Sequence, residues 1–256
     1  MDELAALRRS PPTTALFVDF DGTLSPIVAR ADAARPLPGV AALLVELGRR
    51  FAVVAVVSGR PVSFLAAHLP GEVELHGLYG LEARIGGVHE QHAAAEAWRG
   101  AIDDVAQQAA TTGPDGIDVE HKGLSVTLHL RRRPDLLAPT EAWAVAAAAR
   151  TGLSLRAAKA SFELHPPVAV DKGTVVEARA AGMTAAAYLG DDAGDLPAFD
   201  ALDRLSTRGM ATVKVAVATV ESVASLTAAA DVVVDGPAGA VGFLAGLLSS
   251  LSRPPP

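Results

Sequence analysis

The chain has 256 residues, of which 50% are hydrophobic and 20% are charged, and its formal net charge is -7. This length and apolar content suffice for one large domain, or for a core domain that carries a smaller inserted one. The composition argues against disorder, and the absence of a basic block longer than Arg131–Arg133 argues against a nucleic-acid partner, so we expect a small-molecule partner.

The first predicted elements form a βαβ unit. Thr13–Asp19 is an apolar run that ends in a carboxylate, which is typical of a buried strand running into a tight turn. Apolar residues then recur at helical spacing from Val40 to Leu47, and Phe51–Val57 is a second continuous apolar run rich in valine. Strands buried on both faces of a parallel sheet have this uninterrupted pattern.

The middle of the chain has a different pattern. Polar and apolar residues alternate between positions 125 and 130, which indicates a half-exposed antiparallel strand. Around it we predict helices near Ala93–Ala110 and Asp135–Arg150, and strands near Ile117–His121, Leu153–Arg156 and Phe162–His165. We therefore expect a smaller α/β domain at residues 90–166, inserted into a core domain of residues 1–89 and 167–256.

Helices and strands alternate again in the last third of the chain. We predict a helix at Lys172–Gly182, a strand at Ala185–Leu189, another helix, and a strand at Val213–Val217. This alternation predicts an α/β core built on a Rossmann-like, doubly wound parallel sheet. Pro237–Leu251 is shorter than the roughly 20 residues of a membrane span, so we predict a packed terminal helix.

The sequence contains no cysteine and no apolar run of signal-peptide length near its start. Disulfide bonds, thiolate chemistry and cysteine-ligated zinc are therefore excluded. We expect a cytoplasmic protein without a membrane partner, and a monomer is compatible with the sequence.

Two carboxylates stand at the end of the first predicted strand, in the segment Asp19-Phe20-Asp21-Gly22-Thr23-Leu24. Ligands of open α/β sheets bind at this edge. A carboxylate can attack phosphorus and form an acyl phosphate, which suits Asp19. Asp21 could protonate the leaving alkoxide and then take a proton from the attacking water. A plain Asp-Gly turn is the alternative interpretation.

Two later segments offer groups for a phosphate. In Ser58-Gly59-Arg60, just before a predicted helix, the hydroxyl and free backbone amides can hold phosphate oxygens, and an ordinary N-cap is the alternative. Lys172 follows a predicted N-cap, Asp171, at the positive end of a helix, where a cation is mildly unfavourable. Charge complementarity to phosphate and carboxylates explains this lysine, and a solvated side chain is the alternative.

Three carboxylates lie within five residues in Asp191–Asp195, directly after the strand Ala185–Leu189. Like charges about 4 Å apart repel by about 4 kcal/mol at an effective dielectric constant of 20, so their convergence on Asp19 requires a cation. Mg²⁺ takes oxygen ligands and shares its coordination with substrate phosphate. We predict a magnesium site formed by Asp19, the Asp21 backbone carbonyl and Asp191, with Asp192 and Asp195 as direct or supporting groups. One capping aspartate with two exposed ones is the alternative.

These four segments resemble the four motifs of the haloacid dehalogenase superfamily of phosphatases. Asp19 and Asp21, then Ser58, then Lys172, and finally the three aspartates of the acidic loop stand in the motif places. The resemblance covers the α/β core and implies a Mg²⁺-dependent phosphatase with an aspartyl-phosphate on Asp19. The insert is similar to the α/β cap of the sugar-phosphatase branch, which implies that the insert sets specificity.

Within that branch the sequence resembles the trehalose-6-phosphate phosphatases. The segment His76–Glu82 is similar to the one after that family's second motif. The resemblance implies hydrolysis of trehalose 6-phosphate, the last step of trehalose biosynthesis. It also implies substrate-binding roles for Gly59, Arg60, His76, Gly77, Glu120, Lys122, Lys159 and Glu163. Residues 120 and 122 are two apart and so share one face of a strand, although cross-strand ion pairing is the alternative interpretation.

Three positions depart from the family pattern. Gly194 and Leu196 stand where relatives usually carry Thr and Glu, and His165 stands where they tend to have Arg. We interpret His165 as forming a local hydrogen bond before Pro166. Alternatives that remain open are a capped phosphatase for another phosphorylated disaccharide, pseudo-disaccharide or glycosyl glycerate, a phosphomutase, and a sugar-phosphate sensor without activity.

Overall fold

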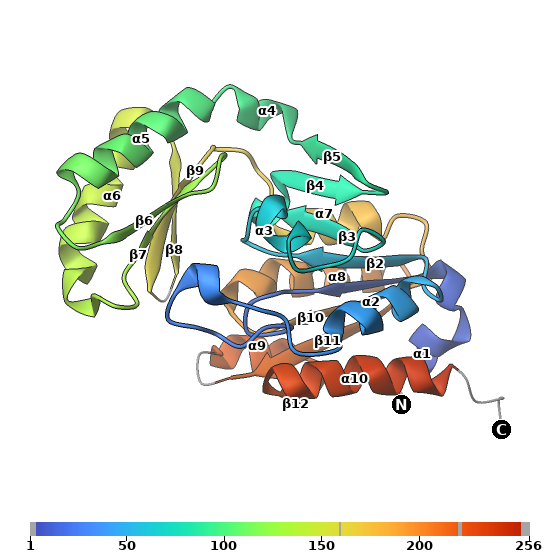
Figure 1. Cartoon of the computed structure of the whole chain (residues 1–256). Coiled ribbons are helices and arrows are strands. Elements are labelled where there is room, and N and C mark those ends of the chain that lie inside the picture. Colours follow the sequence, from blue (N-terminus) through green and yellow to red (C-terminus); the bar gives the residue numbers. More distant parts are fainter. Residues whose placement is uncertain (1–3, 159, 220–221, 252–256) are drawn as a thin grey trace. The chain divides into compact units, whose positions relative to one another are not determined.

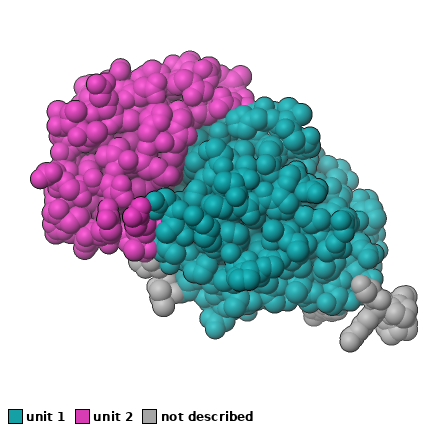
Figure 2. Space-filling model, in the orientation of Figure 1, with its two compact units in different colours: residues 1–28, 32–90, 170–256 teal, residues 29–31, 91–169 magenta. Residues whose placement is uncertain are grey.

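The structure is a computed structural model that describes residues 4–158, 160–219 and 222–251. The chain divides into two compact units, which Figure 2 colours separately. We call them the core unit, built from residues up to 28, 32–90 and 170 onward, and the insert unit, built from residues 29–31 and 91–169.

The core unit is built on an eight-stranded sheet with the order β12-β11-β10-β1-β2-β3-β4-β5 (Figure 1). The strands β1 to β3 and β10 to β12 pair in parallel, whereas β4 is antiparallel to β3. The strands are β1 (Thr14–Val18), β2 (Val53–Val57), β3 (Glu74–Gly77), β4 (Glu82–Ile85), β5 (Val88–Gln91), β10 (Ala185–Gly190), β11 (Ala211–Ala218) and β12 (Val232–Asp235).

Helices cover both faces of this sheet. The α-helices of the core unit are α1 (Leu4–Arg9), α2 (Val40–Gly48), α3 (Val62–Ala66), α7 (Lys172–Arg179), α8 (Leu196–Thr207), α9 (Ala224–Ala229) and α10 (Gly236–Ser250). Along β1, Leu16 packs in a cluster with residues of α1, α2 and α10, whereas Phe17 packs in a second cluster with residues of α7, α8 and α9. Both faces are therefore buried, which explains the uninterrupted apolar runs and confirms the doubly wound α/β prediction.

The insert unit is a four-stranded antiparallel sheet with the order β6-β7-β9-β8. Its strands are β6 (Asp118–His121), β7 (Val126–His129), β8 (Ser154–Ala158) and β9 (Ser161–His165), and its α-helices are α4 (Ala93–Glu96), α5 (Arg99–Thr112) and α6 (Leu137–Thr151). Val126 and Leu128 pack with apolar residues of α5 and α6. The opposite face of β7 carries the polar side chains of the alternating pattern.

One predicted helix of the insert unit is wrong in its extent. Instead of a single helix over residues 93–110, α4 ends at Glu96 and α5 begins at Arg99. Trp98, which caps α5, packs against the apolar cluster of the insert unit, and its ring lies near Gly152. Packing of this large side chain accompanies the break between the two helices.

The predicted terminal helix is present as α10. Among the helices in the described ranges, none combines the length and the apolar content needed to cross a membrane.

Candidate active site

The structure brings the four predicted segments of the core unit to one edge of its sheet. The central strand β1 pairs with both β2 and β10, so the residues that follow these three strands are neighbours. Asp19 follows β1, Ser58 follows β2 and Asp191 follows β10, while Lys172 begins α7. This is the carboxyl edge of the sheet, where ligands of doubly wound folds bind.

A buried cluster of charges forms at this edge. The Lys172 Nζ atom lies 2.8 Å from Asp19 Oδ1 and 2.6 Å from Asp195 Oδ1. Carboxylate oxygens of Asp19, Asp191 and Asp195 lie within 4.8 Å of one another, a spacing that could hold a metal ion. The three aspartates and the lysine are at most 5% exposed. Such crowding of like charges in a buried place is unfavourable unless a cation is shared.

The pKa values show that the negative charges of Asp19 and Asp191 are not fully neutralised by the one nearby ammonium. Burial raises the pKa of Asp19 well above its usual range, and it raises the pKa of Asp191 to about 9, with the neighbouring carboxylates adding to the effect. Burial alone would lower the pKa of Lys172, but Asp19 and Asp195 hold it well above the ordinary value. When all three carboxylates are ionised, as metal binding requires, they and the ammonium carry a net charge of -2, which matches one divalent cation.

Asp195 accepts hydrogen bonds from side chains and backbone amides of the cluster. Its Oδ1 accepts hydrogen bonds from Lys172 Nζ and the Tyr188 hydroxyl, both at 2.6 Å. Its Oδ2 accepts from the backbone amides of Asp191 at 2.9 Å and Asp192 at 3.1 Å. Because both oxygens already have protein partners, Asp195 is suited to orienting the site, and Asp19 and Asp191 are better placed as direct metal ligands.

Asp192 is not among the three carboxylates that lie within 4.8 Å of one another, although its charge contributes to the raised pKa of Asp19. Its side chain is exposed, and its carboxylate accepts a hydrogen bond of 2.8 Å from the Gly194 amide as the cap of a short 3₁₀ turn. The structure therefore places Asp192 at the margin of the predicted magnesium site.

The turn after Asp19 requires glycine. Gly22 has a φ of +77°, in the left-handed region that glycine adopts readily. A Cβ atom at this position would lie 2.0 Å from Asp191 Oδ2. Gly22 therefore lets the loop after β1 approach the acidic loop Asp191–Asp195 closely.

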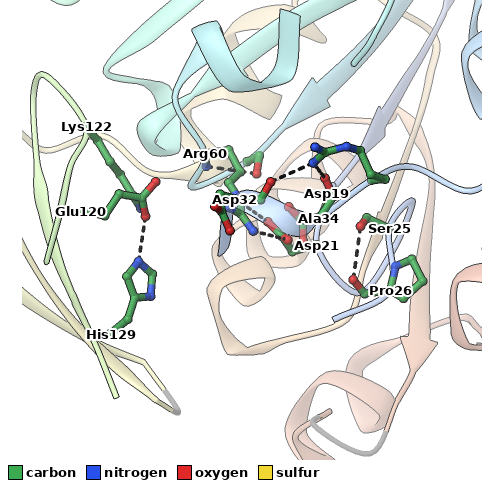
Figure 3. Close-up of polar contacts among 12 residues, drawn as sticks. Asp19, Asp21, Ser25, Pro26, Asp32, Ala34, Arg60, Glu120, Lys122 and His129 are labelled. Atoms are coloured by element: carbon green, nitrogen blue, oxygen red, sulfur yellow. Dashed lines mark hydrogen bonds and ion pairs between the residues drawn. The ribbon is translucent and has the colours of Figure 1, made fainter. Parts of the chain in front are cut away.

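Asp21 is held by an arginine from the neighbouring loop, as Figure 3 shows. Arg60 donates from Nε and Nη2 to the two carboxylate oxygens of Asp21, each at 2.7 Å. The guanidinium also lies 4.6 Å from the ring centroid of Phe64. The sequence analysis assigned Arg60 to the substrate and missed this ion pair, which no local pattern marks because the partners are far apart in the chain.

Ser58 is buried, and its Oγ accepts a 3.2 Å hydrogen bond from the Arg60 amide. Helix α3 begins at Val62, with Pro61 as the extended residue before it. The Ser58 hydroxyl therefore stands close to the carboxyl end of β2. We call the Ser58–Arg60 segment the phosphate loop after its predicted role, although the Ser58 and Arg60 amides already donate to acceptors within the protein.

His76 and Gly77 support the phosphate loop. The Ser58 amide donates to the His76 carbonyl at 2.9 Å. A Cβ atom at Gly77 would lie 2.7 Å from the Arg60 carbonyl oxygen, so only glycine fits there. The His76 ring lies 3.5 Å from the Glu74 carboxylate. Both predicted substrate residues thus contact the backbone or side chains of the core unit.

The insert unit gathers a second polar cluster on one face of its sheet. Lys122 Nζ lies 4.0 Å from Glu120 Oε2 and 3.6 Å from Glu163 Oε1. Ser125 donates to Glu163 at 2.7 Å, and Arg156 donates to it at 3.2 Å. Figure 3 shows Glu120 and Lys122 near one another. Three predicted sugar-binding residues therefore meet, whereas Lys159 lies outside the described residues.

Glu163 remains charged in its buried position. Burial favours the neutral acid, but Lys122 and Arg156 outweigh it and hold the pKa of Glu163 below its usual range. The sequence analysis missed Arg156, which pairs with Glu163 across β8 and β9. His129, also missed, contacts Glu120 at 2.7 Å.

His165 forms the local contact that we predicted. Its Nδ1 lies 2.9 Å from the Pro166 carbonyl and donates to it. Burial and the Arg156 charge lower the pKa of His165, so it supplies no fixed positive charge beside Glu163. Arg156 provides that charge instead.

Comparisons with known proteins give one consistent result. Residues 17–235 match the model of the trehalose-phosphatase family. A trehalose-phosphate phosphatase of Mycobacterium ulcerans is 36% identical over 219 residues, covering 78% of this chain and 55% of the relative. Its counterpart in Mycobacterium avium is 37% identical over 204 residues, covering 73% and 51%. The chain therefore spans about half the length of the curated relatives it matches.

A solved structure shows the same fold. The C-terminal domain of Candida albicans trehalose-6-phosphate phosphatase superposes with a TM-score of 0.79 at 23% identity. The match covers 96% of this chain and 95% of that one.

Proposed function

The chain belongs to the trehalose-phosphatase family, and on this premise we propose that it hydrolyses trehalose 6-phosphate to trehalose and inorganic phosphate. The observation that carries this proposal is the buried cluster of Asp19, Asp191, Asp195 and Lys172 at the carboxyl edge of the sheet. Such a set of groups suits phosphoryl transfer, which depends on positioning and on neutralising charge.

The metal that we propose is Mg²⁺. The residual charge of -2 and the purely carboxylate donor set fit a hard divalent cation. Asp19, Asp191 and the backbone carbonyl of Asp21 would hold the ion, with Asp195 orienting the site and Asp192 at its margin. When bound, the ion neutralises negative charge on the carboxylates and on the phosphate.

We assign the reaction to this chain's own side chains. A carboxylate oxygen of Asp19 attacks phosphorus, and the bond to the sugar oxygen breaks as Asp21 donates a proton to that oxygen. Water then attacks the phosphorus of the aspartyl-phosphate and gives a proton to Asp21, which releases phosphate and restores the Asp19 carboxylate. Lys172 offsets developing charge, and Ser58 with the Gly59 amide holds phosphate oxygens.

In the proposed reaction Arg60 has the role of orienting the carboxylate of Asp21. Its two hydrogen bonds fix the orientation of the Asp21 carboxylate. Because both oxygens of Asp21 are hydrogen-bonded to Arg60, one of them must be released before Asp21 can carry a proton to the leaving oxygen, and the arginine holds the carboxylate in place until then. We therefore assign Arg60 to orienting Asp21 as well as to the phosphate site.

The insert unit supplies the recognition of the sugar in our proposal. Glu120, Lys122 and Glu163 offer charged donors and acceptors on one face of a sheet, as hydroxyl-rich ligands require. We propose that residues 90–166 act as a cap domain on a core of residues 1–89 and 167–256, with Lys159 as a further sugar ligand.

Phosphate release from a panel of sugar phosphates tests this function. The panel should contain trehalose 6-phosphate, other disaccharide phosphates, a glycosyl glycerate phosphate and glucose 6-phosphate, each with Mg²⁺ and with EDTA. We expect the highest kcat/KM for trehalose 6-phosphate, activity only with Mg²⁺, and none in Asp19→Asn.

Other results of this assay would contradict the proposed substrate, the proposed reaction or the proposed nucleophile. Equal rates on several unrelated esters would refute the substrate assignment, and an isomerised sugar phosphate would indicate a phosphomutase. Binding of trehalose 6-phosphate without release of phosphate would indicate a sensor. Undiminished release by Asp19→Asn would refute the nucleophile assignment.

A further inference from the structure

Two adjacent residues of the core unit adopt a backbone conformation that side chains rarely tolerate. Leu78 has a φ of +50° and Tyr79 a φ of +59°, and no other non-glycine residue in the described ranges has a positive φ. For residues with a Cβ atom this conformation is strained. Such strain persists only where the surroundings enforce it, and it is concentrated at functional sites.

Hydrogen bonds to the phosphate loop enforce the conformation. The Leu78 amide donates to the Arg60 carbonyl and the Tyr79 amide donates to the Ser58 carbonyl, both at 3.0 Å. The Leu78 side chain is buried in the core unit. The strained pair is therefore tied to the loop that carries Ser58.

The Tyr79 ring lies beside two of the predicted catalytic segments and within cation-π distance of a third. A Cβ atom at Gly59, in the phosphate loop, would lie 2.8 Å from the ring atoms Cε2 and Cζ. A Cβ atom at Gly194, in the acidic loop, would lie 3.6 Å from Cε1. The Lys172 Nζ atom lies 5.9 Å from the ring centroid. One ring thus fits between two glycines and faces the ammonium that holds Asp19.

We propose that Tyr79 is a positioning residue for Lys172, an inference that rests on the proposed phosphatase function. The negative face of the ring attracts the ammonium, and this attraction is stronger where water is excluded. Asp19 and Asp195 bind the ammonium directly at 2.8 and 2.6 Å, and the ring lies over it with its centroid 5.9 Å away. The strained backbone is what brings the ring to this place.

This position of the ring gives a physical reason for the glycine at position 59. Any side chain at Gly59 collides with the ring, so the phosphate loop must carry glycine there. At Gly194 a Cβ atom would make an ordinary contact of 3.6 Å with the ring, so the ring does not require glycine there.

Two substitutions at position 79 distinguish the effect of the aromatic ring from the effect of the strained backbone. Tyr79→Asn removes the ring and retains a residue that tolerates positive φ, so it keeps the local fold. Tyr79→Phe keeps the ring. Both variants and the wild type are assayed for kcat and KM with p-nitrophenyl phosphate and with trehalose 6-phosphate.

We expect Tyr79→Asn to lower kcat about tenfold, which corresponds to about 1.4 kcal/mol, on both substrates. Tyr79→Phe should stay within about twofold of the wild type. Wild-type kcat in Tyr79→Asn would overturn the proposal. A loss confined to trehalose 6-phosphate would overturn it in favour of a sugar contact, and an equal loss in Tyr79→Phe would assign the effect to the hydroxyl.

A second measurement does not depend on activity. The free energy of urea unfolding is measured in EDTA for the wild type, Tyr79→Asn, Lys172→Met and the double variant. If the ring positions Lys172, the two single effects will not add. Additive effects would overturn the proposal. If the wild type releases no phosphate, the proposed function is refuted instead. The double-mutant cycle would still decide whether the ring and the ammonium interact.

Discussion

Replacing Asp191 with asparagine should stabilise the metal-free protein at neutral pH, although it removes a carboxylate from the active site. Asp191 is 2% exposed, and burial with the nearby charges of Asp19 and Asp195 raises its pKa from an ordinary 3.8 to about 9. Because this pKa is higher in the folded state than in the unfolded state, the folded protein binds more protons between the two pKa values. The free energy of unfolding therefore falls as the pH rises from about 4 to about 9.

The size of the effect follows from the same pKa. Each pH unit between 3.8 and neutral pH corresponds to 1.36 kcal/mol, which gives an upper value of about 4 kcal/mol at pH 7. Because the neighbouring carboxylates share the same protons, we expect Asp191→Asn to gain about 1 to 4 kcal/mol in EDTA. The neutral amide of asparagine has nearly the same shape and carries no charge to bury.

Urea unfolding in EDTA between about pH 5 and pH 9 checks this prediction. The stability of the wild type should fall as the pH rises, and that of Asp191→Asn should fall less. Adding Mg²⁺ should stabilise the wild type and leave the variant nearly unchanged, since a ligand stabilises only the state that binds it. Asp200→Asn, at an exposed position of α8, is the control and should follow the wild type. An Asp191→Asn protein that is less stable than the wild type in EDTA at pH 8 would refute the reasoning.

Three further substitutions test other parts of the site. Gly22→Ala places a Cβ atom 2.0 Å from Asp191 Oδ2, so Mg²⁺ affinity measured by calorimetry should fall at least about tenfold, and unchanged affinity would contradict the close approach. Arg60→Met frees Asp21, and kcat for p-nitrophenyl phosphate should fall about 10- to 100-fold, whereas a wild-type kcat would show that the ion pair is dispensable. Arg156→Met leaves its glutamate partner less well held, so KM for trehalose 6-phosphate should rise about tenfold. The same variant should hydrolyse p-nitrophenyl phosphate normally, and equal losses on both substrates would argue against a role in sugar recognition.

The central strands and the position of Asp19 at the edge of the sheet could be predicted from sequence because strong local patterns mark them. Residues 14–18, 53–57 and 185–190 are buried on both faces and read as continuous apolar runs. Polar residues directly after such strands then identify the edge of the sheet that holds the site.

Other elements carry no such pattern. Strand β3 contains Glu74 and His76, and its glutamate is held by Arg179 of α7, a partner distant in sequence. The edge strand β5 is exposed throughout and has no apolar face. These strands form because neighbouring strands offer backbone hydrogen bonds, which composition does not reveal.

Side-chain partners were the least predictable part of the site. The motifs identified Asp21 and Arg60 separately, but the pairing of one with the other depends on two loops meeting in space. Likewise, nothing in the segment His76–Glu82 indicates that Tyr79 has a positive φ, because that conformation is imposed by hydrogen bonds to another loop. Local propensity describes single segments, and these contacts arise only after the segments pack.

The central claim is that Asp19 takes the phosphoryl group from the substrate before water does. Protein mixed with trehalose 6-phosphate and Mg²⁺ is quenched in acid during turnover, reduced with borohydride to convert an acyl phosphate into an alcohol, and digested for mass spectrometry. We predict that the modification falls on the peptide containing Asp19, at that residue, and is missing from Asp19→Asn. Modification of a different side chain, or phosphate release by the wild type without any modification of Asp19, would contradict the account.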